Sequence, residues 1–201
     1  AERKVAALVV DTGYPPGAMP LEEMRRLHPS EIHEVFRIET CAEALLRKGL
    51  PYPEFLESFV QELRSAARHC VALKTIIAYR SGLAVRSWEA KDATRAYQAE
   101  LSRAETGKAL RLTEKPLLDT LLLSALEVAR ERSLPFQFHT GLGDPDIDLL
   151  QANPLLLRPL LEDPAWAELR IVLLHMAYPY FREAAFMTAV WPQVLLDLSL
   201  A

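Results

Sequence analysis

The stretch Pro135-Phe-Gln-Phe-His-Thr-Gly-Leu-Gly-Asp-Pro-Asp146 joins a short apolar run to a glycine-containing turn, and His139 stands at the junction. The apolar part is too short for a typical helix and is rich in phenylalanine, which predicts a strand buried on both faces that ends near the histidine. Five similar runs cover residues 5–14, 35–40, 71–79, 170–176 and 194–201. The sequence therefore predicts six buried strands.

Segments with helical spacing lie between these runs, at residues 21–27, 39–49, 52–70, 116–133, 153–169 and 180–192. Alternating strands and helices require a parallel sheet, because parallel neighbours cannot be joined by a tight hairpin. The sheet could be open and doubly wound, or part of a (β/α)8 barrel. The phosphate-binding patterns GxGxxG and GxxxxGK[ST] are absent from the chain, which favours the barrel.

Residues 81–113 do not form one clean element. Their charged, helix-prone centre predicts a helical surface insertion of the kind that covers the mouth of a barrel. Apart from this insertion, residues 1–201 are expected to form a single domain.

The composition excludes several classes of protein. The chain has 23 basic and 27 acidic residues and a net charge of -4, which argues against a nucleic-acid interface. No apolar segment is long enough to cross a bilayer, and no signal peptide is visible. The two cysteines, Cys41 and Cys70, have no metal-binding spacing and suggest no disulfide framework, so a reducing cytoplasm is expected.

Polar residues occur near the ends of the apolar runs. An unpaired polar side chain on a buried strand costs roughly 1–3 kcal/mol, so a shared polar site is the simplest explanation for all of them. They are Asp11, Arg37, Glu39, Lys74, His139, His175, Asp197 and Ser199.

Each of these residues also has a purely structural interpretation. A single strand-end histidine is more often a hydrogen-bonded residue of the rim than a metal ligand, and Lys74 is more often paired with a carboxylate of a neighbouring strand. The combination of His139, His175 and Lys74 on successive strands favours a functional site. Two neutral imidazoles could bind zinc and generate a hydroxide nucleophile near neutral pH. Lys74 could be carbamylated, or could orient an anionic substrate as a cation.

The segments VALKTIIAYRSGL, PFQFHTGLGDPDIDLL and RIVLLHMAYPYF resemble the metal-dependent amidohydrolase superfamily. The branch that the chain resembles is the one fused to, or paired with, glutamine-synthetase-like proteins in fungi and plants. The resemblance implies a (β/α)8 barrel with a divalent metal, usually zinc. It also implies that His139 is a metal ligand and that His175 is a second ligand or the catalytic histidine. Lys74 corresponds to the lysine that the family carries on its fourth strand.

The same resemblance makes the predicted barrel incomplete. The six runs correspond to strands two to seven, and the family's first-strand His-x-His pair and eighth-strand aspartate are not found. We therefore expect the natural protein to be longer at both ends. Exposed outer strands favour self-association, so a homo-oligomer is also expected.

The expected activity is hydrolysis of a C–N or C–O bond of a small polar substrate by metal-activated water, with Lys74 and His175 as catalytic residues. Arg37, Tyr79 and Arg80 are expected to contact the substrate. The alternatives are a non-oxidative decarboxylase, in which Arg37 or Arg80 holds a carboxylate, and a non-catalytic barrel beside a synthetase-like domain. Weaker candidates, at the rim or in a solvated loop, are Asp144, Asp146, Asp148, Tyr178 and Tyr180.

Overall fold

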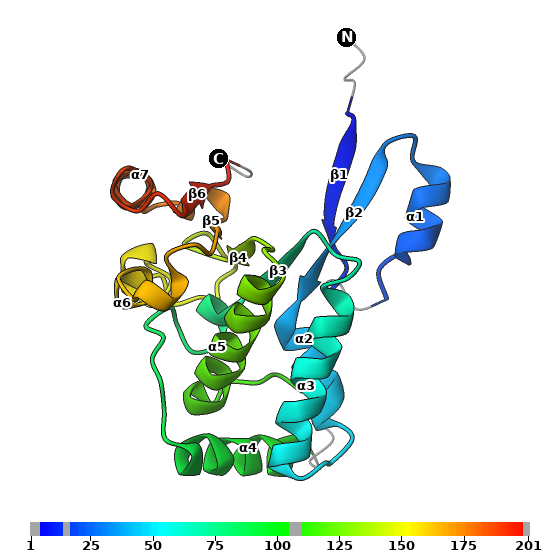
Figure 1. Cartoon of the computed structure of the whole chain (residues 1–201), viewed down its shortest axis with the longest axis vertical. Coiled ribbons are helices and arrows are strands. Elements are labelled where there is room, and N and C mark those ends of the chain that lie inside the picture. Colours follow the sequence, from blue (N-terminus) through cyan, green and yellow to red (C-terminus); the bar gives the residue numbers. More distant parts are fainter. Residues whose placement is uncertain (1–4, 14–16, 105–109, 199–201) are drawn as a thin grey trace.

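The structure is a computed structural model that describes residues 5–13, 17–104 and 110–198. Within these ranges six parallel strands form one sheet, in the order in which they follow one another along the chain. The sheet curls, and helices cover its outer side (Figure 1). This arrangement is an incomplete (β/α)8 barrel, as predicted. The strands are β1 (Ala7–Asp11), β2 (Glu31–Arg37), β3 (Ala72–Thr75), β4 (Phe136–Phe138), β5 (Ile171–Leu173) and β6 (Val194–Leu196).

The helices follow the predicted segments closely, with one exception. Residues 153–169 were expected to form one helix, but they form three short elements because a proline lacks the N–H donor that a continuing helix needs. The α-helices are α1 (Leu21–Leu27), α2 (Ile38–Leu46), α3 (Tyr52–Ala66), α4 (Ala90–Ala104), α5 (Lys115–Glu131), α6 (Arg158–Leu161) and α7 (Phe181–Val190). The 3-10 helices are η1 (Ile77–Tyr79), η2 (Pro154–Leu157), η3 (Pro164–Trp166) and η4 (His175–Ala177).

The second strand lies earlier in the chain than predicted. Residues 35–40 were expected to form it, but β2 ends at Arg37 and α2 begins at Ile38, so Glu39 belongs to a helix and not to a strand end. The first five residues of β2, residues 31–35, pair with β1, an outer strand whose Val9 is 57% exposed. The expectation that every strand is buried on both faces is therefore wrong at this edge: β1 carries an apolar run yet is half-exposed, and the first four residues of β2, residues 31–34, are mostly polar.

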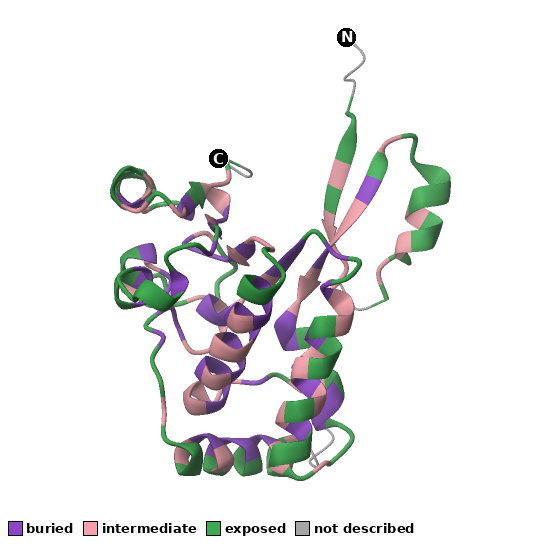
Figure 2. Ribbon diagram, viewed as in Figure 1, coloured by how far each residue is buried: buried purple, intermediate pink, exposed green. Residues whose placement is uncertain are grey.

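The core lies between the sheet and helices α3 and α5 (Figure 2). Phe55, Phe59 and Leu63 recur every four residues along α3 and are fully buried. Phe136 and Phe138 of β4 are equally buried in the same core. Side chains alternate along a strand, so Gln137 faces the inside of the curled sheet.

The strand register sets one row of residues along this inner face. Arg37 pairs with Lys74, and Lys74 pairs with Gln137. The row continues to Val172 and Leu195. Two cations on neighbouring strands are thereby placed side by side on the concave side of the sheet.

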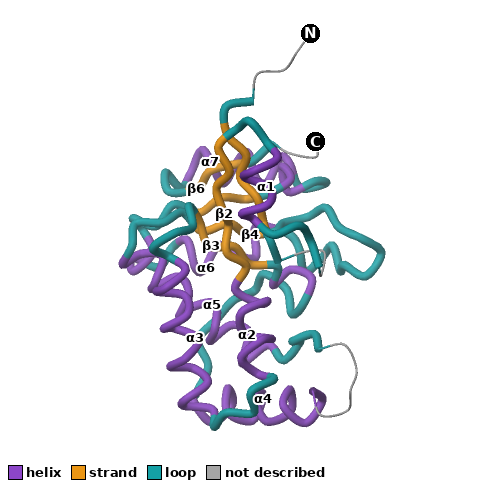
Figure 3. Tube along the Cα trace, turned by 90° about the vertical axis from the view of Figure 1, so that its right-hand side faces the viewer, coloured by secondary structure: helices purple, strands orange, loops and turns teal. Residues whose placement is uncertain are grey.

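Helix α4, which belongs to the predicted insertion at 81–113, lies across the ends of α2, α3 and α5 (Figure 3). Tyr97 packs its ring 4.8 Å from that of Phe55. The buried Glu100 carboxylate accepts hydrogen bonds from the backbone N–H groups of Thr113 and Glu114, at 2.6 and 2.7 Å. These contacts attach α4 to the start of α5. That the segment is an insertion stays a prediction.

Candidate active site

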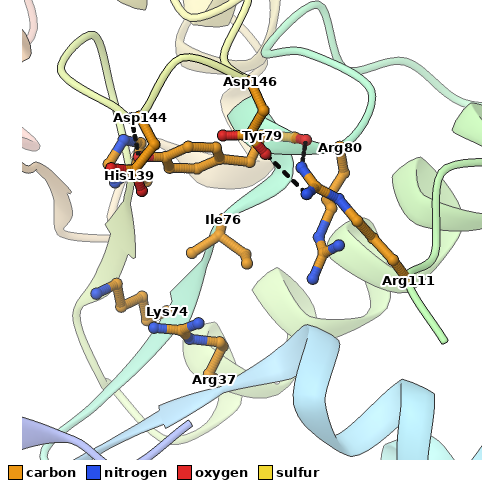
Figure 4. Close-up of a pocket in the computed structure, with 9 residues that line it drawn as sticks. All are labelled: Arg37, Lys74, Ile76, Tyr79, Arg80, Arg111, His139, Asp144 and Asp146. Atoms are coloured by element: carbon orange, nitrogen blue, oxygen red, sulfur yellow. Dashed lines mark hydrogen bonds and ion pairs between the residues drawn. The ribbon is translucent and has the colours of Figure 1, made fainter. Parts of the chain in front are cut away.

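A pocket of about 360 Å³ lies beyond the ends of strands β2 to β4 (Figure 4). Its wall contains four cationic side chains and one of the two histidines predicted to bind metal. The lining residues are Arg37, Lys74, Ile76, Tyr79, Arg80, Arg111, His139, Asp144 and Asp146.

Asp11, the last residue of β1, holds two of these cations. Its Oδ2 atom accepts hydrogen bonds from Arg37 Nε at 3.0 Å and Arg37 Nη2 at 2.5 Å, and it lies 2.8 Å from Lys74 Nζ. Burial alone would raise the pKa of Asp11, but the hydrogen bond from Arg37 and the charge of Lys74 outweigh that effect and lower it. Lys74 is thus paired with a carboxylate, as the structural alternative predicts, but the carboxylate comes from β1, two strands away, and not from a neighbouring strand.

His139 follows β4 directly and extends the pairing of β3 with β4, because its backbone N–H donates to the carbonyl of Thr75 at 3.0 Å. Its side chain is buried, and its Nε2 atom contacts the carbonyl oxygen of Leu142. A carbonyl can only accept, so Nε2 carries the proton and Nδ1 keeps the lone pair. The ring of Tyr79 lies 4.5 Å from that of His139, between centroids.

His175 lies in the turn after β5, and its ring centroid is 4.7 Å from that of His139. His175, Met176 and Ala177 all have positive φ angles, between 48° and 64°, which L-residues adopt at a cost of order 1–3 kcal/mol each. The backbone N–H of His175 donates to Asp197 Oδ2 at 3.2 Å, and that of Met176 to the Asp197 carbonyl at 2.8 Å. Asp197 thus holds the backbone of this strained turn.

Gly141 explains why glycines follow His139. It has a φ angle of 60°, and a Cβ atom there would lie 2.3 Å from the carbonyl oxygens of Ala177 and Tyr178. A residue with a side chain would push the turn after β4 away from the turn after β5. The glycine therefore allows His139 and His175 to approach one another.

Both imidazoles are neutral near pH 7. Burial lowers the pKa of His139 to about 4, with further contributions from His175 and Lys74, and only the Leu142 carbonyl opposes the shift. Burial and the charge of Lys74 also lower the pKa of His175, against the effect of Asp197. Neutral imidazole is the form that binds metals.

The chain is similar in sequence and fold to known proteins. Residues 58–201 match the model of an amidohydrolase family. The chain belongs to the amidohydrolase family. The amidohydrolase is 32% identical to protein fluG of Emericella nidulans, over 86% of the chain and 23% of that protein. It also resembles the crystal structure of a candidate metal-dependent hydrolase from Lactobacillus casei, with a TM-score of 0.87, 32% identity, and coverage of 96% of this chain and 51% of the other.

The amidohydrolase chain thus spans about half of the solved relative and about a quarter of the curated one. Its fold is the one expected from its sequence, and its membership of a hydrolase family is consistent with the expected class of activity. No helix in the described part of the chain combines the length and hydropathy needed to cross a bilayer.

The described residues of the site suit a metal ion by their chemistry, but there are too few of them to hold it. His139 and His175 offer neutral nitrogens, and the Nε2–H of His139 is bound by a backbone carbonyl, as is usual for a ligating histidine. Among the described residues there is no group of three histidines, cysteines or carboxylates that could hold an ion. His139 and His175 can therefore supply two ligands of a site that needs at least one more.

Arg111 is a pocket residue that the sequence did not indicate. It lies in the segment 81–113, where charged residues are numerous and no pattern separates it from the others. Its Nη1 atom is 2.8 Å from Asp146 Oδ2, and its Nη2 atom donates to the Tyr79 carbonyl at 2.7 Å. Only the folded loop shows that this arginine reaches the pocket.

The remaining candidates are distributed around the site. The Tyr79 hydroxyl accepts a hydrogen bond from the backbone N–H of Asp144 at 3.2 Å, while Asp144 and Asp148 are exposed, as expected of a solvated loop. Tyr180 donates its hydroxyl proton to the Leu149 carbonyl, and Tyr178 is exposed. Ser199 lies outside the described residues.

Proposed function

We propose that the amidohydrolase chain is part of a metal-dependent hydrolase that cleaves a C–N or C–O bond of a small polar substrate. The observation that supports this best is the convergence of His139 and His175, whose ring centroids are 4.7 Å apart beside the pocket. Both are neutral, and both come from turns held in place by backbone contacts. Membership of the amidohydrolase family supports the same class of reaction.

In this proposal His139 and His175 are two of the metal ligands, and zinc is the favoured ion because imidazole suits it. A bound divalent metal would polarise the scissile carbonyl and make water nucleophilic at neutral pH. The alternative role proposed for His175 is that of the catalytic histidine, with His139 remaining a ligand. Further ligands would come from outside the described residues.

Lys74 is proposed to act as an ammonium ion and not as a carbamate. Its Nζ atom lies 2.8 Å from Asp11 Oδ2, and carbamylation would put a second negative charge against that carboxylate. A cation here can attract and orient a polar substrate. Arg37, Tyr79 and Arg80 line the same pocket and are proposed to contact the substrate.

Zinc binding by the chain tests the metal ligands. The dissociation constant is measured by competition with a zinc-sensitive dye for the wild type, His139→Ala, His175→Ala and the double variant. Each single variant is expected to bind zinc at least 10-fold more weakly. His33→Ala is the matched control, because the His33 side chain is 40% exposed and pairs with Glu31 at 3.4 Å. Equal zinc affinity in the wild type and the double variant would refute the assignment.

Decarboxylation is the second candidate, and the four cations of the pocket favour it because they suit a carboxylate substrate. The two reactions release different products. Carbon dioxide release from carboxylic acids and ammonia release from amides can be measured on the same metal-loaded protein. Ammonia without carbon dioxide supports hydrolysis of a C–N bond.

A further inference from the structure

Arg80 is a cation of the pocket whose hydrogen-bonding capacity is largely unused. Its side chain is only 11% exposed, and within the described ranges it forms an ion pair with Glu43 alone, at 3.2 Å between Arg80 Nη2 and Glu43 Oε1. Its Nε atom is buried and has no hydrogen-bond partner among the described residues. A buried guanidinium with unpaired donors is costly to the fold unless a further acceptor completes it.

Arg37, on the other side of the pocket, is different. Its Nε and Nη2 atoms both donate to the carboxylate of Asp11. That carboxylate neutralises only one of two charges, since Lys74 shares it. The Arg37 guanidinium is therefore already engaged by a carboxylate, which leaves Arg80 as the better candidate to receive an anion.

The surroundings of Arg80 disfavour its charged form in the absence of a further anion. Burial lowers the pKa of Arg80, and the charges of Arg111 and Arg37 lower it further, while Glu43 and Glu39 oppose the shift. The Glu39 carboxyl is fully buried, and burial raises its pKa despite the hydrogen bonds from Thr75 and the backbone of Ile76. Protonation of Glu39 would leave Glu43, with Asp146 in the same pocket, as the described carboxylates that compensate Arg80.

The pocket separates Arg80 from the histidines. Figure 4 shows His139 at one side, Arg80 at the other and Ile76 between them. A volume of about 360 Å³ suits a small molecule. A ligand that spans it can place one end on Arg80 and the other beside His139, with an apolar spacer over Ile76.

We propose that the substrate is a small carboxylic acid whose carboxylate binds Arg80, at the opposite end of the pocket from His139 and His175. The assignment of the reacting end rests on the proposed function, whereas the carboxylate site depends only on Arg80 and its neighbours. Glu43 occupies part of the guanidinium when no ligand is present and competes with the incoming carboxylate.

Calorimetric titration of the metal-free chain with glutarate and with its neutral diamide, glutaramide, tests the proposal. Metal is removed with 1,10-phenanthroline, which carries no carboxylate. The wild type should bind glutarate at least 10-fold more tightly than glutaramide, because charge-assisted hydrogen bonds to arginine are strong. Arg80→Met should abolish this preference. Arg158→Met is the matched control and should keep it, because Arg158 pairs with Glu162 at the surface.

Glu43→Gln is a second variant, and its expected effect, tighter binding of glutarate, cannot result from a folding defect. Glu43 Oε1 also accepts a hydrogen bond from the backbone N–H of Leu112 at 3.2 Å, and a glutamine oxygen can keep that bond. Removal of the competing charge should tighten glutarate binding about 3- to 10-fold. If Arg80→Met does not fold, Arg80→Lys, which lacks the planar fork, should weaken glutarate binding instead.

Three results would overturn the proposal: no preference for glutarate in the wild type, a preference that survives in Arg80→Met, or glutarate binding in Glu43→Gln no tighter than in the wild type. Because these titrations contain no metal, they are independent of the zinc measurement. Zinc binding unaffected by the histidine variants, together with an Arg80-dependent preference, would refute the proposed function and leave this carboxylate site.

Discussion

Strands β4 and β1 belong to the same sheet but lie in opposite environments. Phe136 and Phe138 of β4 are fully buried between the sheet and the helices, whereas Val9 of β1 is 57% exposed and β1 pairs with β2 alone among the described strands. The site draws on both regions, because His139 follows β4 and Asp11 ends β1. Packing of β4 therefore positions His139, whereas the ion pairs of Asp11 hold β1 to residues on β2 and β3.

The largest expected effect on stability is at the buried centre of the sheet, in β4. Phe138→Ala should lower the free energy of unfolding by about 3–5 kcal/mol, because it removes a fully buried ring and leaves a cavity beside Phe136. Urea unfolding followed by circular dichroism measures the loss. Phe138→Leu, which keeps much of the volume, should cost less than half as much. A loss below 1 kcal/mol for Phe138→Ala would mean that β4 is not the packed centre.

Asp11→Asn should have an intermediate effect at the junction of the two regions. It leaves Arg37 and Lys74 without their shared carboxylate, and a loss of about 1–3 kcal/mol is expected, below that for a fully buried pair because these side chains are 13–15% exposed. Urea unfolding at pH 7 measures it. Asn keeps the size of Asp, so an unchanged stability would show that the ion pairs contribute nothing.

The pH dependence of stability in the same variant tests the ion pairs of Asp11 independently. The pKa of Asp11 is lowered in the folded chain, so its stabilisation is complete above the unfolded value of about 3.8–3.9 and is lost as the pH falls through the lower, folded value. The difference in stability between wild type and Asp11→Asn should therefore shrink below about pH 4. A difference that is constant down to pH 2 would contradict the assignment.

The sequence predicted the apolar strands better than the polar one. The runs at 5–14, 71–79, 135–141, 170–176 and 194–201 each contain an observed strand, because a buried strand is apolar on both faces and even the outer strands β1 and β6 keep apolar residues. β2 was displaced because its polar residues, such as Glu31 and His33, face solvent at the edge. Which side chains of a strand face solvent depends on the position of the strand in the sheet, so it cannot be predicted from the composition of a short segment.

The same distinction holds for the site. His139, His175 and Lys74 could be predicted because each interrupts an apolar run. Arg111 could not, because it lies in a charged segment and reaches the pocket only through Asp146 and the Tyr79 carbonyl. The pairing of both cations with Asp11 likewise depends on the curl of the sheet, which brings the end of β1 to residues on β2 and β3.

The smallest effect on stability is expected at the edge, where Val9→Lys should change the free energy of unfolding by no more than about 0.5 kcal/mol. An exposed strand edge is a template for pairing with another chain, and a lysine there opposes such pairing. Sedimentation velocity should therefore show less self-association in Val9→Lys than in the wild type, in keeping with the homo-oligomer expected from the sequence. Val9→Thr, which keeps a β-branched side chain without the charge, is the control and should associate like the wild type. A loss of more than 1 kcal/mol in Val9→Lys would show instead that this face of β1 is covered in solution, and the contrast between edge and centre would fail.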